Sequence, residues 1–514
     1  MTQDGQQPQE TRKSPDETPK LPGEARESLA GRSRRWILTV GTALAIIGTV
    51  MGFVADALGL FEFTQEQFVS DEKRGALVNF ATSLVPTATP SPLPMATATP
   101  TPLPVVAEAG ERLLLVTQFA NYAQSTSYNV AGRIYEALSG QVRSAELADT
   151  RVAVWPDTVG DEDAAVSVLD ATHAALVIWG EYDSGRVRVS FALPGKGTAL
   201  DWQRLLTGPD ELSTTINLDV PRETQALALM ALGRLYRDAG DFARARAAFV
   251  RALAQEPIEP DTVATLNFYL AYLLANTPPV DLDAAIAGYS RVIELRPEWV
   301  NAYYNRGVAY LDRYYATVTT NDLVLALDDF AATLAARPGY VEALINRGIA
   351  YYIRNEEGDL THAIQDLDAA TTLAPDDYRP FFNRGLARIR AADGSDWAGD
   401  LSRSLALAPD YWQAHYALCW GYALDNQPEQ GREHCDLALA QDSSGAAGDA
   451  RCLILAELGL LAEAAGEAQA YLDWLHTLPT AWYAKSNGPV FEQVLDALTA
   501  GRNPVTPELL ARLR

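Results

Sequence analysis

AYYNRGVAYLDR (residues 302–313) returns as ALINRGIAYYIR (343–354) and as PFFNRGLARIRA (380–391). The three segments share the triplet Asn-Arg-Gly, and the stretch after each triplet ends at a proline, at Pro338, Pro375 and Pro409. Self-similarity at a spacing of about 20 to 50 residues is typical of stacked supersecondary units. We therefore expect the second half of the chain to form a solenoid, in which each unit buries its apolar face against its neighbours.

The composition limits what this solenoid can belong to. The chain has 514 residues, 48% of them hydrophobic, which is enough for several domains with buried cores. Its formal net charge is -25. Binding to nucleic acid depends on clustered basic side chains that neutralise phosphates, so the charge excludes that class of partner. A neutral or basic protein or peptide partner is expected instead.

The N-terminal region has the pattern of a membrane anchor. Residues 1–35 are polar and lack periodicity, which predicts a disordered tail. Residues 36–55 (WILTVGTALAIIGTVMGFVA) carry no charge and would span about 30 Å as a helix, which predicts a single transmembrane helix. Basic residues precede this segment and acidic residues follow it, so we expect a cytoplasmic N-terminus and extracytoplasmic C-terminal domains. A cleaved signal peptide and a buried soluble helix are the alternatives.

Two features extend the prediction of an anchor. Gly48 and Gly52 form a G-x-x-x-G pair that would let two such helices pack as a homodimer, although glycine is also common in membrane helices generally. Residues 56–84 are expected to form a juxtamembrane helix. Residues 85–107 are rich in proline and threonine and should form an extended linker that holds the rest of the chain away from the membrane.

Residues 108–220 show the pattern of a small α/β domain. Strands are expected at 112–119, 151–156, 174–182 and 186–193, with helices at 129–142 and 162–171. This βαβαββ order resembles the N-terminal α/β domains of TolB-like envelope proteins. An acidic loop and a histidine near the third strand lack the spacing of a catalytic or metal site, so we expect no enzyme activity, no cofactor and no metal. The residues concerned are Asp157, Asp161, Glu162, Asp163 and His173.

The helical repeats begin after Pro221. The first contains, in order, Leu232-Gly233, Tyr236, Gly240, Ala245, Phe249, Ala252 and Pro257. At these positions the chain resembles the tetratricopeptide repeat (TPR) family. The resemblance implies an all-α superhelix of about six to seven helix pairs over residues 221–475, with capping helices over 476–514. Insertions in later repeats should form projecting loops between helices, and Trp397 occupies a place where the family usually has alanine.

The resemblance also implies candidate binding residues. In the family, an asparagine directly before the Leu-Gly place often points into the concave groove and bonds a peptide backbone. Asn305, Asn346 and Asn383 match that place, and Tyr304 and Phe382 beside two of them could offer stacking surface. The alternative is that all five side chains serve packing and local hydrogen bonds within the solenoid.

The three cysteines of the chain lie in the last repeats. Cys419 and Cys435 are expected on facing helices of one pair, and thiols outside the cytoplasm tend to oxidise, so a Cys419–Cys435 disulfide is predicted. A Cys435–Cys452 pair and three buried thiols are the alternatives. Zinc binding through Cys435 and the adjacent His434 is not expected, because neighbouring helical residues point apart.

Taken together, the sequence predicts a multidomain protein with one transmembrane helix, a small α/β domain and an all-α TPR solenoid. The expected function is that of a single-pass scaffold in the cytoplasmic membrane, which binds an extended peptide or partner helix in its concave groove. Two other functions are compatible with the sequence. One is a cell-envelope enzyme activator or glycan-binding accessory protein that uses the α/β domain, and the other is a transmembrane sensor.

Overall fold

The structure is a computed structural model. It describes residues 106–122, 127–143, 147–194, 197–206, 209–255, 258–441, 445–478, 480–483 and 485–514. The predicted tail, transmembrane helix, Gly48 and Gly52, the juxtamembrane helix and all but the last two residues of the linker lie outside these residues. Among the helices that the structure describes, none is both long and apolar enough to cross a membrane.

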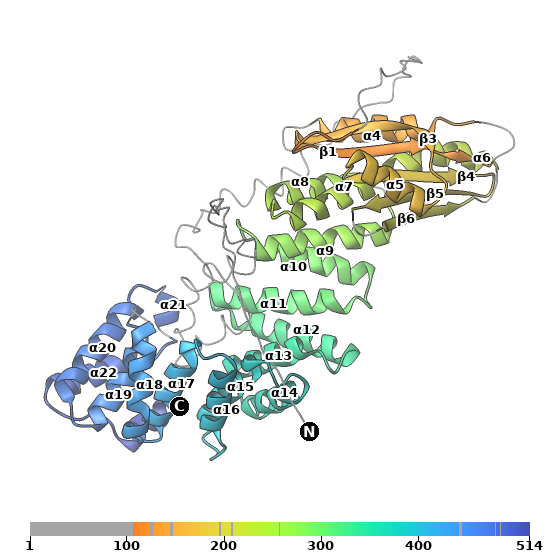
Figure 1. Ribbon diagram of the computed structural model, residues 1–514. Coiled ribbons are helices and arrows are strands. Elements are labelled where there is room, and N and C mark those ends of the chain that lie inside the picture. Colours follow the sequence, from red (N-terminus) through yellow and green to blue (C-terminus); the bar gives the residue numbers. More distant parts are fainter. Residues whose placement is uncertain are drawn as a thin grey trace, which may run out of the picture.

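The described part begins with a mixed sheet in the order β3-β1-β4-β5-β6, with the short β2 paired to β4. β1 runs parallel to β3 and β4, whereas β4, β5 and β6 are antiparallel neighbours (Figure 1). The elements of this domain are β1 (Arg112–Gln118), β2 (Ala120–Asn121), α4 (Val130–Val142), β3 (Thr150–Thr158), α5 (Glu162–Thr172), β4 (Leu176–Tyr182), β5 (Arg186–Leu193), β6 (Gly197–Leu205), α6 (Pro209–Thr214) and the π-helical turn η3 (Thr215–Asp219).

Alternate residues of β1 explain why helices cover both faces of the sheet. Leu114 and Val116 belong to a core shared with α4, whereas Leu113 and Leu115 belong to a second core shared with α5. Successive side chains of a strand point to opposite faces, so a run of buried aliphatic residues predicts a strand that is buried on both sides. The strands and helices predicted in this domain are present, and β2 and β6 are additional to them.

The α/β domain is joined to the first helical repeat by a continuous core. Its first cluster of buried residues extends from β1 and α4 into the helix α7 (Val220–Asp238). The hydroxyl of Tyr236, the aromatic residue of the first repeat, donates to Asp149 and lies 3.0 Å from Thr150 Oγ1. Arg112 stacks 4.3 Å from the centre of the Tyr236 ring. The α/β domain therefore covers the N-terminal end of the solenoid, the role that a polar cap performs in repeat proteins.

The solenoid consists of antiparallel helix pairs, whose first and second members we call A and B helices. Consecutive A helices contact one another along the stack, and so do the two helices of each pair. The A helices are α7, α9 (Pro260–Asn276), α11 (Val300–Thr317), α13 (Val341–Arg354), α15 (Tyr378–Ala391), α17 (Trp412–Leu424) and α19 (Gly448–Glu457). The B helices are α8 (Phe242–Leu253), α10 (Leu282–Leu295), α12 (Thr320–Ala336), α14 (Asp359–Leu373), α16 (Trp397–Leu407), α18 (Pro428–Gln441) and α20 (Leu461–Leu475).

The insertions do not form projecting loops in the third repeat, where the sequence predicts one near residues 313–321. α11 has 18 residues and α12 has 17, and only Val318 and Thr319 separate them. The expectation is wrong because the inserted residues continue the helical pattern. Arg313 in the last turns of α11 bonds Asp322 in the first turn of α12, which holds the two extended ends together.

Trp397 fits the fifth repeat because a glycine in the next repeat makes room for it. A Cβ atom on Gly421 would lie 2.5 Å from the Trp397 ring. The indole Nε1 of Trp397 donates to Asp425 at 3.1 Å, just beyond the end of α17. The side chain thus reaches across to the following pair, where the family's alanine could not.

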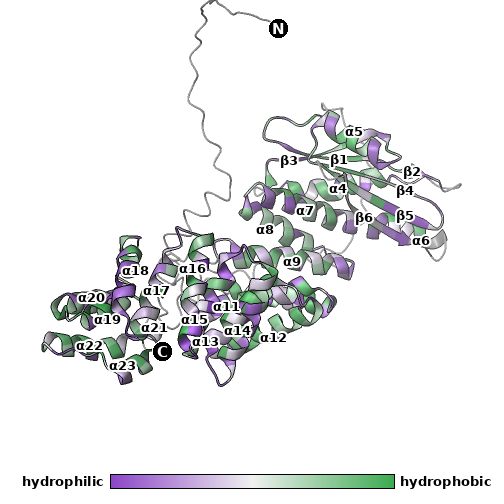
Figure 2. Ribbon diagram, turned by 60° about the horizontal axis from the view of Figure 1, so that its bottom comes forward, coloured by the Kyte–Doolittle hydropathy of each residue, from purple (hydrophilic) through white to green (hydrophobic). Residues whose placement is uncertain are grey.

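The chain ends with α21 (Thr480–Tyr483), α22 (Gly488–Thr499) and α23 (Pro507–Leu513). The largest cluster of buried residues runs from Leu311 in α11 to Leu513 and includes residues of α22 and α23. Figure 2 shows that these helices carry both apolar and polar residues. α22 packs on α20 and covers the last helix pair, as predicted for a cap. α23 instead contacts α17, the A helix of the sixth pair.

Candidate binding surface

The arginine of each Asn-Arg-Gly triplet forms a two-point ion pair with the B helix of the same repeat. Arg306 bonds both carboxylate oxygens of Asp329 at 2.8 Å. Arg347 bonds both oxygens of Asp366 at 2.7 Å. Arg384 bonds Asp400 at 2.9 and 2.5 Å. The planar guanidinium matches a carboxylate in this geometry.

Each of these pairs is largely shielded from water. The side chains of the three aspartates are 6%, 10% and 6% exposed, and those of the arginines 20%, 23% and 15%. The hydrogen bonds to Asp366 raise the pKa of Arg347 above its ordinary value. A shielded pair of this kind fixes how the two helices of a repeat sit against each other, which gives the repeated arginine a role inside the repeat.

The glycine of each triplet marks the point where the two helices approach most closely. A Cβ atom on Gly348 would lie 2.9 Å from Leu367 Cγ and 3.3 Å from the Ala363 carbonyl oxygen. Gly307 and Gly385 would meet Phe330 and Leu401 in the same way, at 2.9 and 2.8 Å. Since the shortest of these distances are below 3.0 Å, a larger residue at any of the three positions would force the facing side chain or the helix to shift.

The three asparagines predicted for the groove are engaged within the solenoid. Asn346 is 3% exposed and donates to the Tyr304 hydroxyl at 3.2 Å. Asn383 is 4% exposed and donates to the Arg379 carbonyl one turn earlier, at 2.9 Å. Asn305 donates to the Asn301 carbonyl at 2.7 Å but is only half-buried. Only Asn305 retains surface that a peptide could reach in this arrangement.

The two aromatic candidates also pack inside the solenoid. The Tyr304 ring lies 4.8 Å from the Tyr340 ring, and burial raises the Tyr304 pKa above its ordinary value. Phe382 is fully buried, and its ring meets Tyr411 edge-on at 4.9 Å. Phe382 therefore has no free face for stacking on a ligand.

The A-helix face of repeats four to six is covered by the end of the chain. Leu513 and Arg514 close a small pocket whose other walls come from α13, α15 and α17. Leu513 is 1% exposed. The wall residues are Tyr352, Leu386, Ile389, Arg390, Trp420 and Leu424. We call this side of the A helices the inward face.

Helical register identifies the same face in the earlier repeats. Leu386, one of the covered residues, directly follows Gly385, where the two helices of the repeat are in close contact. In repeat three, Val308 directly follows Gly307 in the same way. In repeat two, Tyr272 directly follows Ala271, which is in close contact with Gly288. Val308 is half-buried, and Tyr272 is 41% exposed. The inward face is therefore more open in repeats two and three than in repeats four to six.

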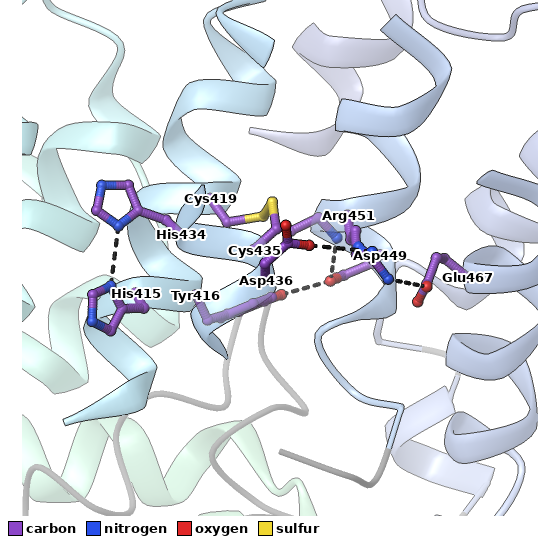
Figure 3. The surroundings of a disulfide bond; sticks show 10 residues. His415, Tyr416, Cys419, His434, Cys435, Asp436, Asp449, Arg451 and Glu467 are labelled. Carbon is purple, nitrogen blue, oxygen red and sulfur yellow. Dashed lines mark hydrogen bonds and ion pairs between the residues drawn. A yellow bond between two sulfur atoms is a disulfide. The ribbon is translucent and has the colours of Figure 1, made fainter. Parts of the chain in front are cut away.

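A disulfide joins α17 and α18. The Sγ atoms of Cys419 and Cys435 lie 2.04 Å apart, and Cys452 is a buried free thiol (Figure 3). On one side of the bond, the Tyr416 hydroxyl donates to the Asp449 carboxylate at 2.8 Å and so ties α17 to α19. The structure thus places the predicted pair together and leaves Cys452 out.

Replacing both Cys419 and Cys435 by alanine should lower the free energy of unfolding by about 3 kcal/mol, the loop-closure value for a ring of this size with a sequence separation of 16. Denaturant unfolding of the variant and the wild-type protein measures the loss. Peptide mapping of the non-reduced protein should recover the two cysteines in one linked peptide pair. Alkylation of all three thiols without prior reduction would contradict the pairing.

Two histidines lie on the other side of the disulfide. His415 Nδ1 in α17 and His434 Nδ1 in α18 are 3.0 Å apart, and the two rings stack (Figure 3). Burial lowers the pKa of both histidines, and the His415 ring further lowers the pKa of His434. A hydrogen bond between these two nitrogens needs one of them to be an unprotonated acceptor. At least one of the two rings must therefore be neutral.

The histidine pair should make stability depend on pH. The folded pKa values lie below the ordinary value of about 6.5, so the unfolded chain binds more protons as the pH falls through that value. Stability should be constant with respect to these groups above about pH 7.5 and decline as the pH falls below about 6.5. Urea unfolding at a series of pH values measures the slope. If the stability of the His415→Gln/His434→Gln variant depends on pH with the same slope as that of the wild-type protein, the histidine pair is not the cause.

The polar residues singled out in the α/β domain have local structural roles. Asp161 is the N-cap of α5 and accepts from the Ala164 amide at 2.8 Å. His173 ends the same helix in the left-handed conformation, with a φ of 53°. Among the described residues, no group of three or more histidine, cysteine, aspartate or glutamate side chains is arranged to hold a metal ion.

Sequence comparisons identify the helical units. Family models described as a tetratricopeptide repeat match residues 226–258 and 318–378, and one described as a TPR repeat matches residues 281–312. These three matches lie within α7 to α15, so they do not test the resemblance of the α/β domain to TolB-like domains. No curated protein matches the chain.

Several solved structures resemble parts of the chain. One is a tetratricopeptide repeat protein from Parabacteroides merdae ATCC 43184, 17% identical over 54% of this chain and 99% of that chain, with a TM-score of 0.41. MamA from Desulfovibrio magneticus RS-1 is 21% identical over 36% of this chain and 97% of that chain, with a TM-score of 0.31. YrrB, described as a TPR protein with an unusual peptide-binding site, is 18% identical over 37% of this chain and 91% of that chain, with a TM-score of 0.32. The family models therefore identify tetratricopeptide repeats between residues 226 and 378, and the paired helices continue the same arrangement to α20.

Proposed function

We propose that this protein is a membrane-anchored scaffold that binds a segment of a partner protein on the inward face of repeats two and three. The observation that carries the proposal is the division of this face. In repeats four to six Leu513 and Arg514 lie against this face, whereas Tyr272 in repeat two is 41% exposed. Large aromatic side chains are favoured anchors in protein interfaces, because they bury much area and lose little conformational entropy.

A polar side chain in the next A helix supports recognition of a peptide backbone. Asn305 in α11 is half-buried and uses one amide hydrogen for the Asn301 carbonyl. An amide side chain has a second donor hydrogen and an acceptor oxygen, so it suits a peptide unit. Asn305 is therefore the member of the predicted asparagine ladder that we retain for partner contact. Asn346 and Asn383 act in the proposal only by fixing the A helices.

The proposed location is the outer side of a cytoplasmic membrane, with residues 36–55 as the anchor. The Cys419–Cys435 disulfide supports it, because disulfides persist mainly in oxidising compartments outside the cytoplasm. The uncharged stretch of 20 residues and the basic residues before it carry the orientation. Protease added to intact cells from which any outer barrier has been removed should degrade residues after 108 and spare the N-terminal tail. Protection of the solenoid would contradict the orientation.

The binding surface can be tested in the full-length protein with a photo-crosslinking amino acid at position 272. Irradiation of cells should link a partner protein to this position. Position 373 in the B helix α14 is the control, since Leu373 is an exposed apolar residue at 51% but lies on an outer helix. Asn305→Ala should reduce the crosslink at 272. Equal crosslinking at the two positions, or crosslinking at 373 alone, would refute the proposed surface.

A further inference from the structure

The chain's own C-terminal segment (residues 480–514) lies where a ligand of the inward face would bind. Arg514 bonds Ile389 and Leu424, which lie 125 and 90 residues earlier in the sequence. Leu509, Leu510 and Leu513 of α23 are at most 9% exposed. α23 therefore docks as an amphipathic helix against the A helices, a mode by which grooves bind helical peptides.

Arg514 satisfies the ends of two A helices. Its guanidinium donates to the carbonyl oxygens of Ile389 in α15, at 3.2 Å, and of Leu424 in α17, at 2.9 Å, and it pairs with the carboxylate of Asp425. Leu424 is the last residue of α17, so its carbonyl has no partner within the helix. The carboxyl end of a helix carries partial negative charge, and a cation placed there is stabilising.

Lys485 makes an equivalent contact with α11. Its ammonium lies 3.5 Å from the carbonyl oxygen of Val318, the C-cap residue, and 5.5 Å from the centre of the Tyr314 ring. Trp482, 3% exposed, meets the same ring edge-on at 6.3 Å. Lys485 and Tyr314 line a pocket of about 480 Å³. The C-terminal segment thus supplies a basic and an aromatic group at this end of the inward face.

Two other A helices, α9 and α13, also have a cation at a carbonyl group near their C-terminal end. At the end of α13, Arg390 from α15 donates to the Tyr352 carbonyl at 2.8 Å. At the end of α9, Arg246 from α8 donates to the Leu273 carbonyl at 3.0 Å. α9 and α13 thus receive their cation from the repeats themselves, whereas α11, α15 and α17 receive theirs from the C-terminal segment.

The connection to α23 permits release without loss of the cap formed by α22. Residues 501–503 are exposed, and Gly501 has a φ of +69°, which glycine adopts without strain. In this connection Asn503 Nδ2 donates to the Ala456 carbonyl at 2.9 Å, and Val505 packs against the largest cluster of buried residues. α23 can therefore leave the inward face while α22 stays packed on α20.

We infer that the inward face of repeats four to six binds a basic amphipathic helix of a partner protein, and that α23 with Arg514 occupies this place until such a helix displaces it. The partner helix presents leucine-like side chains to the apolar walls and an arginine or lysine to the ends of α15 and α17. This inference extends the proposed function, because a partner seated on repeats two and three would continue onto this surface. The net charge of -25 also favours a basic partner.

The inference can be tested with a fluorescent peptide of residues 505–514 (VTPELLARLR) and the full-length protein. In the Leu510→Ala/Leu513→Ala variant, α23 should dock more weakly, so the peptide should bind at least about tenfold more tightly than to the wild-type protein. Replacing the last arginine of the peptide by glutamate should abolish most of this gain. Arg514→Ala in the protein, which removes little apolar area, should also increase peptide binding.

Leu498→Ala is the matched control. Leu498 is 4% exposed in α22, so the change removes one buried leucine side chain of the C-terminal segment without uncovering the inward face. This variant should bind the peptide as weakly as the wild-type protein does. The Leu510→Ala/Leu513→Ala and Arg514→Ala variants must first be shown to be folded by circular dichroism. If both then bind the peptide no more tightly than the Leu498→Ala control does, the inference is overturned. Formation of dimers by the Leu510→Ala/Leu513→Ala variant, measured by light scattering, would also overturn the inference. It would indicate that two copies of the chain exchange their C-terminal segments. Crosslinking at position 272 does not depend on either outcome.

Discussion

Asp366→Ala is expected to lower the free energy of unfolding by about 3 to 5 kcal/mol. The change leaves Arg347, whose side chain is only 23% exposed, without the carboxylate that accepts two of its hydrogen bonds at 2.7 Å. A shielded charge that loses its partner keeps its desolvation cost and loses the attraction that offsets it. The effect should be larger than for most surface substitutions, because the pair joins the two helices of a central repeat.

Two further variants separate this explanation from a general loss of packing. Asp368→Ala removes a carboxylate that also bonds an arginine, Arg384, but is 48% exposed, so it should cost less than about 1 kcal/mol. Replacing Arg347 and Asp366 together by leucine and methionine should restore most of the stability, because neither charge is then buried alone. Urea unfolding of the three variants measures these differences. A loss below 1 kcal/mol for Asp366→Ala would show that the pair does not hold the repeat together.

Trp482→Ala should cost a similar amount, about 3 to 5 kcal/mol, as expected for removing a large buried aromatic side chain. Trp482 is 3% exposed and packs against Tyr314, 168 residues earlier in the chain. This loss should be accompanied by weaker docking of α21 on α11. Trp482→Phe retains a ring in the same place and should cost distinctly less.

Two measurements test this prediction. The first is the free energy of unfolding, and the second is the fluorescence of probes placed next to Tyr314 in a protein with fewer tryptophans, which reports whether α21 is docked. Unchanged stability in Trp482→Ala would mean that α21 does not dock on the third repeat in solution. A large loss for Trp482→Phe would instead indicate that the indole shape, and not burial alone, is required at this site.

The repeat architecture could be predicted because it depends on local and nearly periodic signals. Gly348 and its equivalents occur where helices touch, and their spacing alone indicates paired helices. The function of the triplet could not be predicted in the same way. The arginine of the triplet bonds an aspartate in the second helix of the repeat. The sequence does contain a sign of this aspartate, because an aspartate followed by an apolar residue recurs in the second helices, at Asp329-Phe330, Asp366-Leu367 and Asp400-Leu401. In each case the aspartate binds the arginine and the apolar residue packs on the glycine.

Other features depend on contacts between distant parts of the chain, and the sequence alone carries little trace of them. Residues 507–513 have the pattern of a short amphipathic helix, which fits an end cap and an inward-facing position equally well. The choice between the two is made by Arg514 and the carbonyl groups of Ile389 and Leu424. Burial of Asn346 and Asn383 also follows from how consecutive A helices lie together, so the family resemblance could not show which asparagine stays open.

We conclude that the inward face is divided: the C-terminal segment lies against repeats four to six and against the end of α11, whereas Tyr272 in repeat two is open. Native-state hydrogen exchange of the full-length protein tests this most directly, through the amides of Leu510 to Leu513 in α23. We expect them to be protected as strongly as amides in the middle of α15, and to lose at least about tenfold of that protection in the Leu510→Ala/Leu513→Ala variant. Exchange of these amides in the wild-type protein at the rate of the exposed residues 501–503 would show that the inward face is open throughout, and would contradict the account.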